Sequence, residues 1–382
     1  MDTDTRIDPL HVLIAGGGVA ALETMMALRS LAGDRVRITL LAPDRDFRHR
    51  PTSVAEPFSI AHARQIALVS ICADFDAQHV RGALASVEPG AHCVVTADGE
   101  QIAYDALVVA CGTHSRPAFD RGAMTVDDRA IGVTMRGLLQ DIEQGYSQKV
   151  AFVAPTQAFW PLPLYELALM TAERANAMNV SVEISIVTPE AAPLALFGSG
   201  ISAELSRMLD ASNISFHGSS FAELEHGTLT LRPAGIELHD CRIVALPVLE
   251  GRQIEGIPSD PQGFIAVDEL GAVRGLDGVY AAGDITSSPV KHGGISAQQA
   301  DLVAAAIARR AGADVEPQEL RPHFRGALMT GHATRFLDAE LGDDGVYRST
   351  VSDDCPWESR EKIGALHLGP YLAHGDRYAV RA

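Results

Sequence analysis

Short apolar runs, typical of buried parallel strands, alternate along this chain with longer segments whose apolar residues recur at helical spacing. The segment 11–30, "HVLIAGGGVAALETMMALRS", shows this unit most clearly. It contains an apolar run, a turn of three glycines, and then Leu22, Met25 and Met26 on one helical face. The alternation returns over residues 149–217. The pattern predicts an α/β protein in which helices cover parallel sheets.

The turn at residues 16–18 has the chemistry of a dinucleotide-binding loop. Gly16 permits the tight turn, and Gly18 lets a pyrophosphate approach the backbone. Ala21 is a small residue at the position where helix and strand pack closely, and Gly17 and Ala20 complete the loop. The free N–H groups at the helix start would then face the phosphates. We therefore predict that this loop binds a dinucleotide.

The acid that would hold the adenosine ribose is less regular. The next predicted strand ends within "RVRITLLAPDRDF", and Ala42 stands where such an acid is usual. Asp44, two residues further on, is the expected substitute. An ordinary turn role for Asp44 and Asp46 remains the alternative.

Three further segments resemble parts of a known flavoprotein family. Residues 276–308 include "GVYAAGD" and "PVKHGGISAQQAD", and residues 104–117 read "YDALVVACGTHSRP". With the first glycine turn, they look like the FAD site of the two-dinucleotide-binding-domain FAD-dependent oxidoreductases, the pyridine nucleotide-disulfide reductase-like superfamily. "PVKHGGISAQQAD" narrows the resemblance to the branch of type II NADH dehydrogenases and sulfide:quinone oxidoreductases, and "FRHRPTSVAEPF" (47–58) also looks like a segment of that branch. The resemblance spans nearly the whole chain and implies FAD without naming a substrate.

The resemblance also assigns roles to single residues. Asp284 would hydrogen-bond the ribityl chain, and Cys111 replaces the threonine of an Ala-Thr-Gly segment. Beyond the glycine loop and Asp44, the implied cofactor-binding residues are Arg50, Pro51, Cys111, Gly112, Gly283, Asp284, Lys291, Gly293 and Gly294.

Lys291 and His292 are the catalytic candidates. A helix starting near Gly293 aims its dipole at the preceding loop, and Lys291 adds a full charge, which suits an anionic reduced flavin at N1 and C2=O. The alternative makes both side chains surface loop residues.

A second strand-turn-helix unit, "VAPTQAFWPLPLYELALM" (153–170), has no glycine in its turn. Pro161 and Pro163 remove N–H donors that a pyrophosphate would need. We expect Phe159, Trp160 and Tyr165 to form the wall of an apolar pocket for a substrate or acceptor. A standard or an atypical NAD(P)H site and plain core packing of the aromatic rings remain alternatives, so NAD(P)H binding is uncertain.

The predicted fold is α/β, with two Rossmann-like three-layer domains of FAD and NAD(P) type and a small C-terminal α+β cap. Residues 1–120 and 245–320 would form the FAD-binding domain. Residues 121–244 would form the inserted NAD(P)-binding-like domain, and residues 321–382 the cap.

Composition excludes several classes of partner. The 382 residues contain 31 basic and 49 acidic side chains, and the net charge of −18 repels nucleic acid and anionic lipids. No run approaches the roughly 20 apolar residues of a membrane span, and we expect a cytoplasmic protein. The five cysteines have no CxxC spacing, so we expect neither a disulfide framework nor a metal site. Sulfide-oxidising relatives need a cysteine around residues 326–334, and this chain has none there. The roles of Cys111 and Cys355 stay open.

Together these features predict an FAD-dependent oxidoreductase that passes a hydride or electron pair through flavin N5. The partners would be a small reductant and a small acceptor such as a quinone. One alternative is an NAD(P)H-dependent flavin reductase or dehydrogenase with an atypical nicotinamide site. Another is a flavin-carrying binding or assembly protein without turnover. A homodimer is compatible with the sequence, which specifies neither donor nor acceptor.

Overall fold

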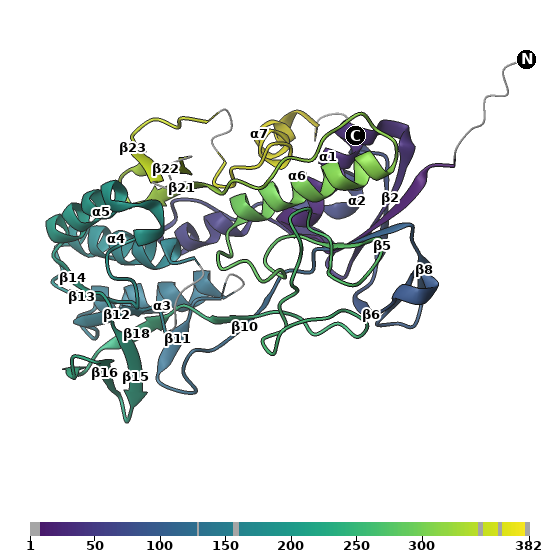
Figure 1. The fold of residues 1–382 in the computed structure, drawn as a ribbon. Helices are drawn as coiled ribbons and strands as arrows, with labels where there is room; N and C mark the ends of the chain where they lie inside the picture. Colours follow the sequence, from purple (N-terminus) through teal and green to yellow (C-terminus); the bar gives the residue numbers. More distant parts are fainter. Residues whose placement is uncertain (1–7, 128–129, 156–159, 343–346, 358–360, 379–382) are drawn as a thin grey trace, which may run out of the picture.

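The computed structural model describes residues 8–127, 130–155, 160–342, 347–357 and 361–378 (Figure 1). The α-helices in these segments are α1 (Val19–Ala32), α2 (Leu68–Asp74), α3 (Ile131–Glu143), α4 (Leu162–Ala177), α5 (Ser199–Ala211), α6 (Gly293–Arg310) and α7 (Leu368–Tyr378). Short 3-10 helices lie at Gly33–Arg35, Arg50–Phe58, Pro89–Ala91 and Ala195–Phe197. No helix among the described residues is long and apolar enough to cross a membrane.

The first sheet is parallel, with the strand order β20-β9-β1-β2-β5. Its strands are β1 (Leu10–Ala15), β2 (Val36–Ala42), β5 (Ala77–Arg81), β9 (Ala106–Val109) and β20 (Val279–Ala281). Alternate strand residues face two cores, one under α1, α2, α6 and α7 and one under the loop residues 254–273. Because both faces are covered, the central strands read as continuous apolar runs.

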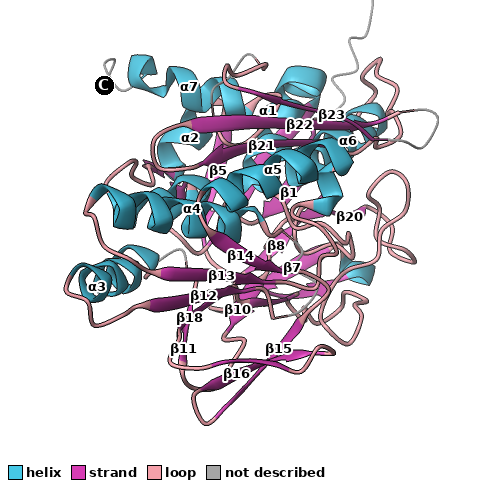
Figure 2. Cartoon of the chain, turned by 90° about the vertical axis from the view of Figure 1, so that its left-hand side faces the viewer, coloured by secondary structure: helices cyan, strands magenta, loops and turns pink. Residues whose placement is uncertain are grey.

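The second sheet is also parallel, with the order β11-β18-β12-β13-β14. Its strands are β11 (Ala123–Thr125), β12 (Lys149–Val153), β13 (Glu183–Val187), β14 (Ile214–His217) and β18 (Arg242–Ala245). Helices α3, α4 and α5 cover one face (Figure 2). An antiparallel sheet of β15 (Phe221–Glu225), β16 (Thr228–Arg232) and β17 (Ile236–Leu238) covers the other. This unit therefore has three layers, but its third layer is a sheet.

Antiparallel strands complete the fold. The C-terminal layer consists of β21 (His323–Met329), β22 (Thr334–Leu341) and β23 (Tyr347–Ser352). The smaller sheets pair β3 (Asp46–Arg48) with β4 (Gln65–Ala67), β10 (His114–Arg116) with β19 (Val248–Glu250), and β7 (Cys93–Thr96) with both β6 (Leu84–Glu88) and β8 (Gln101–Ala103). The α/β class predicted from the sequence is confirmed, with parallel sheets and a small C-terminal layer.

Candidate functional site

Distant segments of the chain meet at the carboxyl edge of the first sheet. In the strand register Ala15 lies beside Val109, and Val109 lies beside Ala281. The loops that follow β1, β9 and β20 therefore leave the sheet at the same edge, where ligands bind in open parallel sheets. A Cβ atom added to Gly283 would lie only 2.8 Å from the Cβ of Ala20, at the start of α1. The first glycine turn and the loop containing Asp284 are therefore in direct contact.

The three glycines of the first turn have different surroundings. Gly16 has a φ of +139°, and an added Cβ would lie 2.2 Å from the carbonyl oxygen of Ala110. At Gly17 the added atom would lie 2.9 Å from Leu68 Cδ1. At Gly18 it would meet nothing within 4 Å. Gly16 and Gly17 therefore allow close packing, whereas Gly18 borders open space at the helix start, which suits a dinucleotide phosphate.

The remaining predicted cofactor residues around this turn have distinct settings. Asp44 is exposed just beyond the end of β2, and Ala21 is buried in α1. Gly112 has a φ of +65°. The Cys111 thiol donates a hydrogen bond to the Ala15 carbonyl at 3.4 Å, and burial raises the pKa of this thiol to about 11. Cys111 is therefore a neutral thiol at physiological pH.

Asp284 and Lys291 place opposite charges at the site. The Asp284 carboxylate accepts a hydrogen bond of 3.1 Å from the Ser296 hydroxyl. Burial raises the pKa of Asp284, and this hydrogen bond partly opposes the shift. The Lys291 ammonium is nearly buried, donates to the Thr286 carbonyl, and lies 4.0 Å from the centroid of the Phe264 ring. Burial lowers the pKa of Lys291 to about 8, and Asp284 opposes this shift. Lys291 is therefore mainly protonated at neutral pH.

His292 precedes α6 and is stacked on Trp160. The two ring centroids lie 3.9 Å apart at an interplanar angle of 27°. Burial, with a smaller contribution from the charge of Lys362, lowers the pKa of His292 to about 3. A Cβ atom at Gly294 would lie 2.8 Å from His292 Cε1, so a glycine is needed beside the imidazole. The ring is therefore neutral and fixed between Trp160 and the helix start.

These elements enclose a cavity of about 270 Å³, which we call the first cavity. Part of its wall is apolar, formed by Val126, Ile131, Trp160, Leu162, Leu246 and Leu249. Its polar lining includes Arg50, Glu166, Asp284, Lys291 and Lys362. Pro51 and Gly293 also line it. Residues from both sheets and from the C-terminal segment therefore share one cavity.

A buried ion pair in this wall was not predicted from the sequence. The Lys362 ammonium donates to Glu166 Oε1 at 2.6 Å and to the Pro51 carbonyl at 3.0 Å. The same Glu166 oxygen accepts the Met329 N–H at 2.9 Å. The two charged side chains are only 1% and 7% exposed. Burial raises the pKa of Glu166, and Lys362 opposes this shift. The single signal in the sequence is an acid inside the apolar run "PLYELALM".

The two other predicted pocket residues are Phe159 and Tyr165. Phe159 lies outside the described residues, so its role stays a prediction. Tyr165 is fully buried in the core and is not among the residues that line the cavity. Its hydroxyl donates a 2.7 Å hydrogen bond to Glu190 Oε2. Glu190 follows β13, where an acid would hold a nicotinamide ribose. Burial raises the pKa of Glu190 to about 6, while Tyr165 opposes the shift. This carboxyl group is therefore already engaged within the protein.

Neither a protein-family model nor a curated protein matches the sequence. Solved structures do match the fold. A sulfide:quinone oxidoreductase from Aquifex aeolicus aligns with a TM-score of 0.79 at 19% identity, over 90% of this chain and 87% of that chain. A ferredoxin reductase from Rhodopseudomonas palustris gives a TM-score of 0.66 at 19% identity, covering 87% and 83%. Putidaredoxin reductase, in its covalent complex with putidaredoxin, gives a TM-score of 0.65 at 16% identity, over 87% of this chain and 82% of that chain. The chain therefore has the two-domain α/β fold of these oxidoreductases, as its sequence resemblance implied.

Proposed function

We propose that this protein is an FAD-dependent oxidoreductase that passes a hydride or electron pair through flavin N5 between a small reductant and a quinone-type acceptor. The observation that carries the proposal is the contact between the first glycine turn and the loop of Gly283 and Asp284. A dinucleotide held by Gly18 would extend from α1 toward Asp284, and Asp284 and Lys291 both line the first cavity. Residues 1–120 and 245–320 would together form the FAD-binding domain.

The residues present fit FAD. Gly18 leaves room for a pyrophosphate, the Asp284 carboxylate can accept hydrogen bonds from ribityl hydroxyls, and Arg50 with Pro51 provides one wall. Bound FAD would supply two-electron chemistry at N5. Lys291 holds positive charge beside the start of α6, where the helix dipole has the same sign. Both favour a negatively charged reduced cofactor. His292 is neutral and shapes the cavity through its contact with Trp160.

The cavity wall suits a planar carbonyl acceptor. Trp160 and the aliphatic side chains provide an apolar surface, and the Lys362 ammonium is a proton donor at that wall. An acceptor carbonyl that takes a hydride or an electron pair also needs a proton on oxygen. Lys362 can donate that proton and take up another from water, and the Glu166 carboxylate, which accepts a hydrogen bond from the same nitrogen, favours the return of Lys362 to its charged form. This pair is therefore our candidate for proton delivery.

Two observations favour this reading over its rivals. Among the described residues that line the first cavity there is no cysteine, which disfavours a thiol relay for sulfide. Glu190 is engaged by Tyr165, which disfavours a nicotinamide ribose at the end of β13.

The test begins with the absorption spectrum of the purified protein after incubation with FAD. Under anaerobic conditions NADH, NADPH, sulfide and a hydroquinone are added separately. We expect a flavin spectrum that is bleached by the hydroquinone. Rapid bleaching by a nicotinamide would instead identify an NAD(P)H-dependent reductase with an atypical site. No bleaching by any donor would indicate a flavin carrier without turnover. A protein that takes up no FAD refutes all three functions.

A second experiment addresses the acceptor. The photoreduced protein is mixed with a quinone or with ferricyanide, which accepts electrons without protons. We expect Lys362→Met to slow reoxidation by the quinone about 100-fold or more, as removal of a general acid does, and to leave ferricyanide reoxidation unchanged. Lys149→Met, at an exposed ion pair with Glu183, is the matched control. Equal slowing with both oxidants would contradict a role in proton delivery.

A further inference from the structure

A second cavity of about 330 Å³ lies between α6, β21 and the C-terminal segment 363–370. Gln298 and Asp301 of α6, His323 and Arg325 of β21, and Trp357 contribute its polar lining. Ile363 borders both this cavity and the first one. The two cavities are therefore neighbours that share Ile363 as a wall residue, and none of the polar residues of the second belongs to the proposed flavin site.

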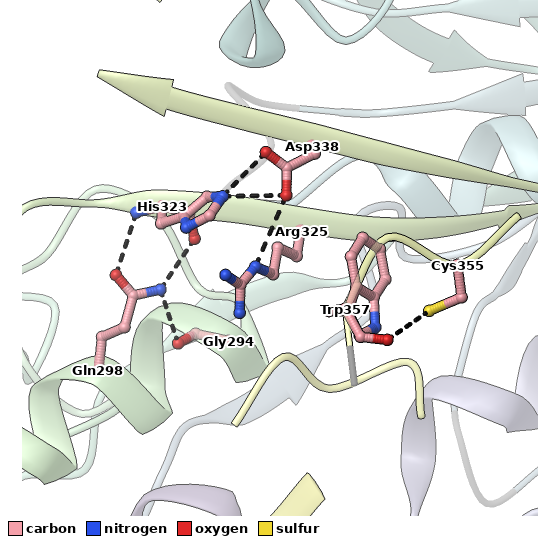
Figure 3. A network of polar contacts seen from close by, with 7 residues as sticks. All are labelled: Gly294, Gln298, His323, Arg325, Asp338, Cys355 and Trp357. Atoms are coloured by element: carbon pink, nitrogen blue, oxygen red, sulfur yellow. Dashed lines mark hydrogen bonds and ion pairs between the residues drawn. The ribbon is translucent and has the colours of Figure 1, made fainter. Parts of the chain in front are cut away.

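Some of its polar groups are fully engaged within the protein. The Gln298 amide donates to the carbonyls of Gly294 at 3.1 Å and His323 at 2.8 Å, and it accepts the His323 N–H at 3.0 Å (Figure 3). His323 Nε2 lies 3.0 Å from both carboxylate oxygens of Asp338. These bonds fix β21 on α6, so Gln298 and His323 form a rigid wall.

Three other groups lack a hydrogen-bond partner among the described residues. Trp357 Nε1, Arg325 Nε and Asp301 Oδ1 are all buried atoms of this kind. Arg325 Nε lies 3.6 Å from Asp338 Oδ2, an ion pair beyond hydrogen-bond range. Figure 3 shows the Arg325 guanidinium between α6 and the Trp357 indole. Two donors and one acceptor thus line the same cavity, and buried polar groups normally find partners.

The position of Arg325 is fixed by the neighbouring segment. A Cβ atom at Gly364 would lie 3.0 Å from Arg325 Cδ and 3.3 Å from its Cβ, so the backbone of Gly364 packs directly on the arginine stem. Burial, followed by the neighbouring Glu23 carboxyl, raises the pKa of Asp301, which weakens the repulsion between this carboxyl group and an anion in the cavity. The guanidinium is therefore held in place at one side of the cavity.

We propose that the second cavity binds a small organic carboxylate. The carboxylate accepts hydrogen bonds from the Arg325 guanidinium and from the Trp357 indole N–H, and its apolar body packs against Ile363, Leu366 and Pro370. A hydroxyl group on the ligand can donate to Asp301 Oδ1. The assignment is independent of the flavin chemistry. Because Ile363 borders both cavities, an occupant would also contact the wall of the first cavity.

The chain contains two tryptophans, so Trp160→Phe leaves Trp357 as the single tryptophan reporter. The flavin-loaded variant is titrated with benzoate, with 2-hydroxybenzoate and with the neutral isostere benzamide. We expect a saturable change in Trp357 fluorescence with both carboxylates. Benzamide should bind at least about tenfold more weakly than benzoate, because the charge-assisted hydrogen bonds are lost. An equal response to benzoate and benzamide would overturn the proposal.

Variants locate the site. Arg325→Gln should weaken benzoate binding about tenfold or more, whereas Arg309→Gln, an exposed arginine in the last turn of α6, should leave it unchanged. Circular dichroism checks that both fold. Trp357→Phe, measured by calorimetry with Trp160 intact, keeps an aromatic side chain and removes the indole N–H. We expect an affinity loss of about threefold to tenfold. Unchanged affinity in Trp357→Phe and Arg325→Gln would refute the site even if benzoate binds elsewhere.

Discussion

Replacing Gly18 by valine should remove cofactor binding while leaving the fold intact. Gly18 has φ −95° and ψ −167°, an extended conformation that valine adopts readily. An added Cβ would meet no protein atom within 4 Å. We therefore expect the free energy of unfolding of the cofactor-free protein to change by about 0.5 kcal/mol or less. In the cofactor-bound protein the branched side chain would occupy the space assigned to the pyrophosphate.

The expected loss of affinity follows from the hydrogen bonds at the helix start. If the valine displaces the phosphates from two backbone N–H groups, each charge-assisted bond lost is worth about 1.5–3 kcal/mol. The sum of about 3–6 kcal/mol corresponds to an increase in the FAD dissociation constant of about 100-fold to 10,000-fold. Titration of the cofactor-free protein with FAD, followed by flavin fluorescence, measures this change.

Gly16→Ala is the informative contrast. Its Cβ would lie 2.2 Å from the Ala110 carbonyl oxygen, at a φ of +139°. Overpacking and the strained backbone together should destabilise the cofactor-free protein by about 2–5 kcal/mol. Gly90→Val, at a glycine whose added Cβ also meets nothing within 4 Å, controls for the valine itself. Wild-type FAD affinity in Gly18→Val would refute our assignment of the phosphate site, and a stability loss equal to that of Gly16→Ala would refute the geometric reasoning.

Two further predictions concern buried charge. Burial lowers the pKa of His49 to about 4 and that of His292 to about 3, so the stability that each contributes is complete above about pH 6.5 and is lost as the pH falls toward these values. The free energy of unfolding can be measured with urea between pH 7 and 4. In His292→Phe its increase with pH should be smaller than in the wild type by about 1.4 kcal/mol per pH unit, and an unchanged pH dependence would contradict the assignment. Lys362→Met should destabilise the protein by about 3–5 kcal/mol, because Glu166 is left buried without its partner, and adding Glu166→Gln should recover most of this loss. The same unfolding assay tests the coupling. If the double variant loses as much free energy of unfolding as the two single variants added together, the two residues are not a coupled pair.

The sequence was sufficient for the architecture of the first sheet because its signals are local. An apolar run, a glycine turn and a helical face occur within residues 11–30, and parallel strands bring their carboxyl ends to one edge. The link to Asp284, more than 260 residues further along, needed the family resemblance. The structure supplies the physical reason, since Gly283 and Ala20 are small enough to touch.

Other features depend on tertiary contacts that no local pattern encodes. The aromatic residues after β12 suggested a common pocket wall, yet Trp160 lines the first cavity whereas Tyr165 points its hydroxyl to Glu190. Trp160 precedes α4 whereas Tyr165 lies within it, and the direction of the tyrosine is set by its acceptor Glu190. The sheet β15–β17 on the far face of the second sheet likewise replaces helices that the Rossmann-like pattern suggested.

The ion pair of Glu166 and Lys362 illustrates how energetics can separate structure from function. The two residues lie 196 positions apart, and both side chains are almost completely removed from water. Replacing such a pair by apolar residues of similar volume is often neutral or stabilising, so its burial is poor evidence of a stabilising role. Its place in the wall of the first cavity is better evidence, because the proposed reaction needs a proton donor there and an apolar pair would provide none. The apolar double variant Glu166→Leu/Lys362→Met therefore separates the two roles. If the pair serves stability, the double variant should be less stable. If it serves proton delivery, the double variant should be equally or more stable but should be reoxidised more slowly by a quinone.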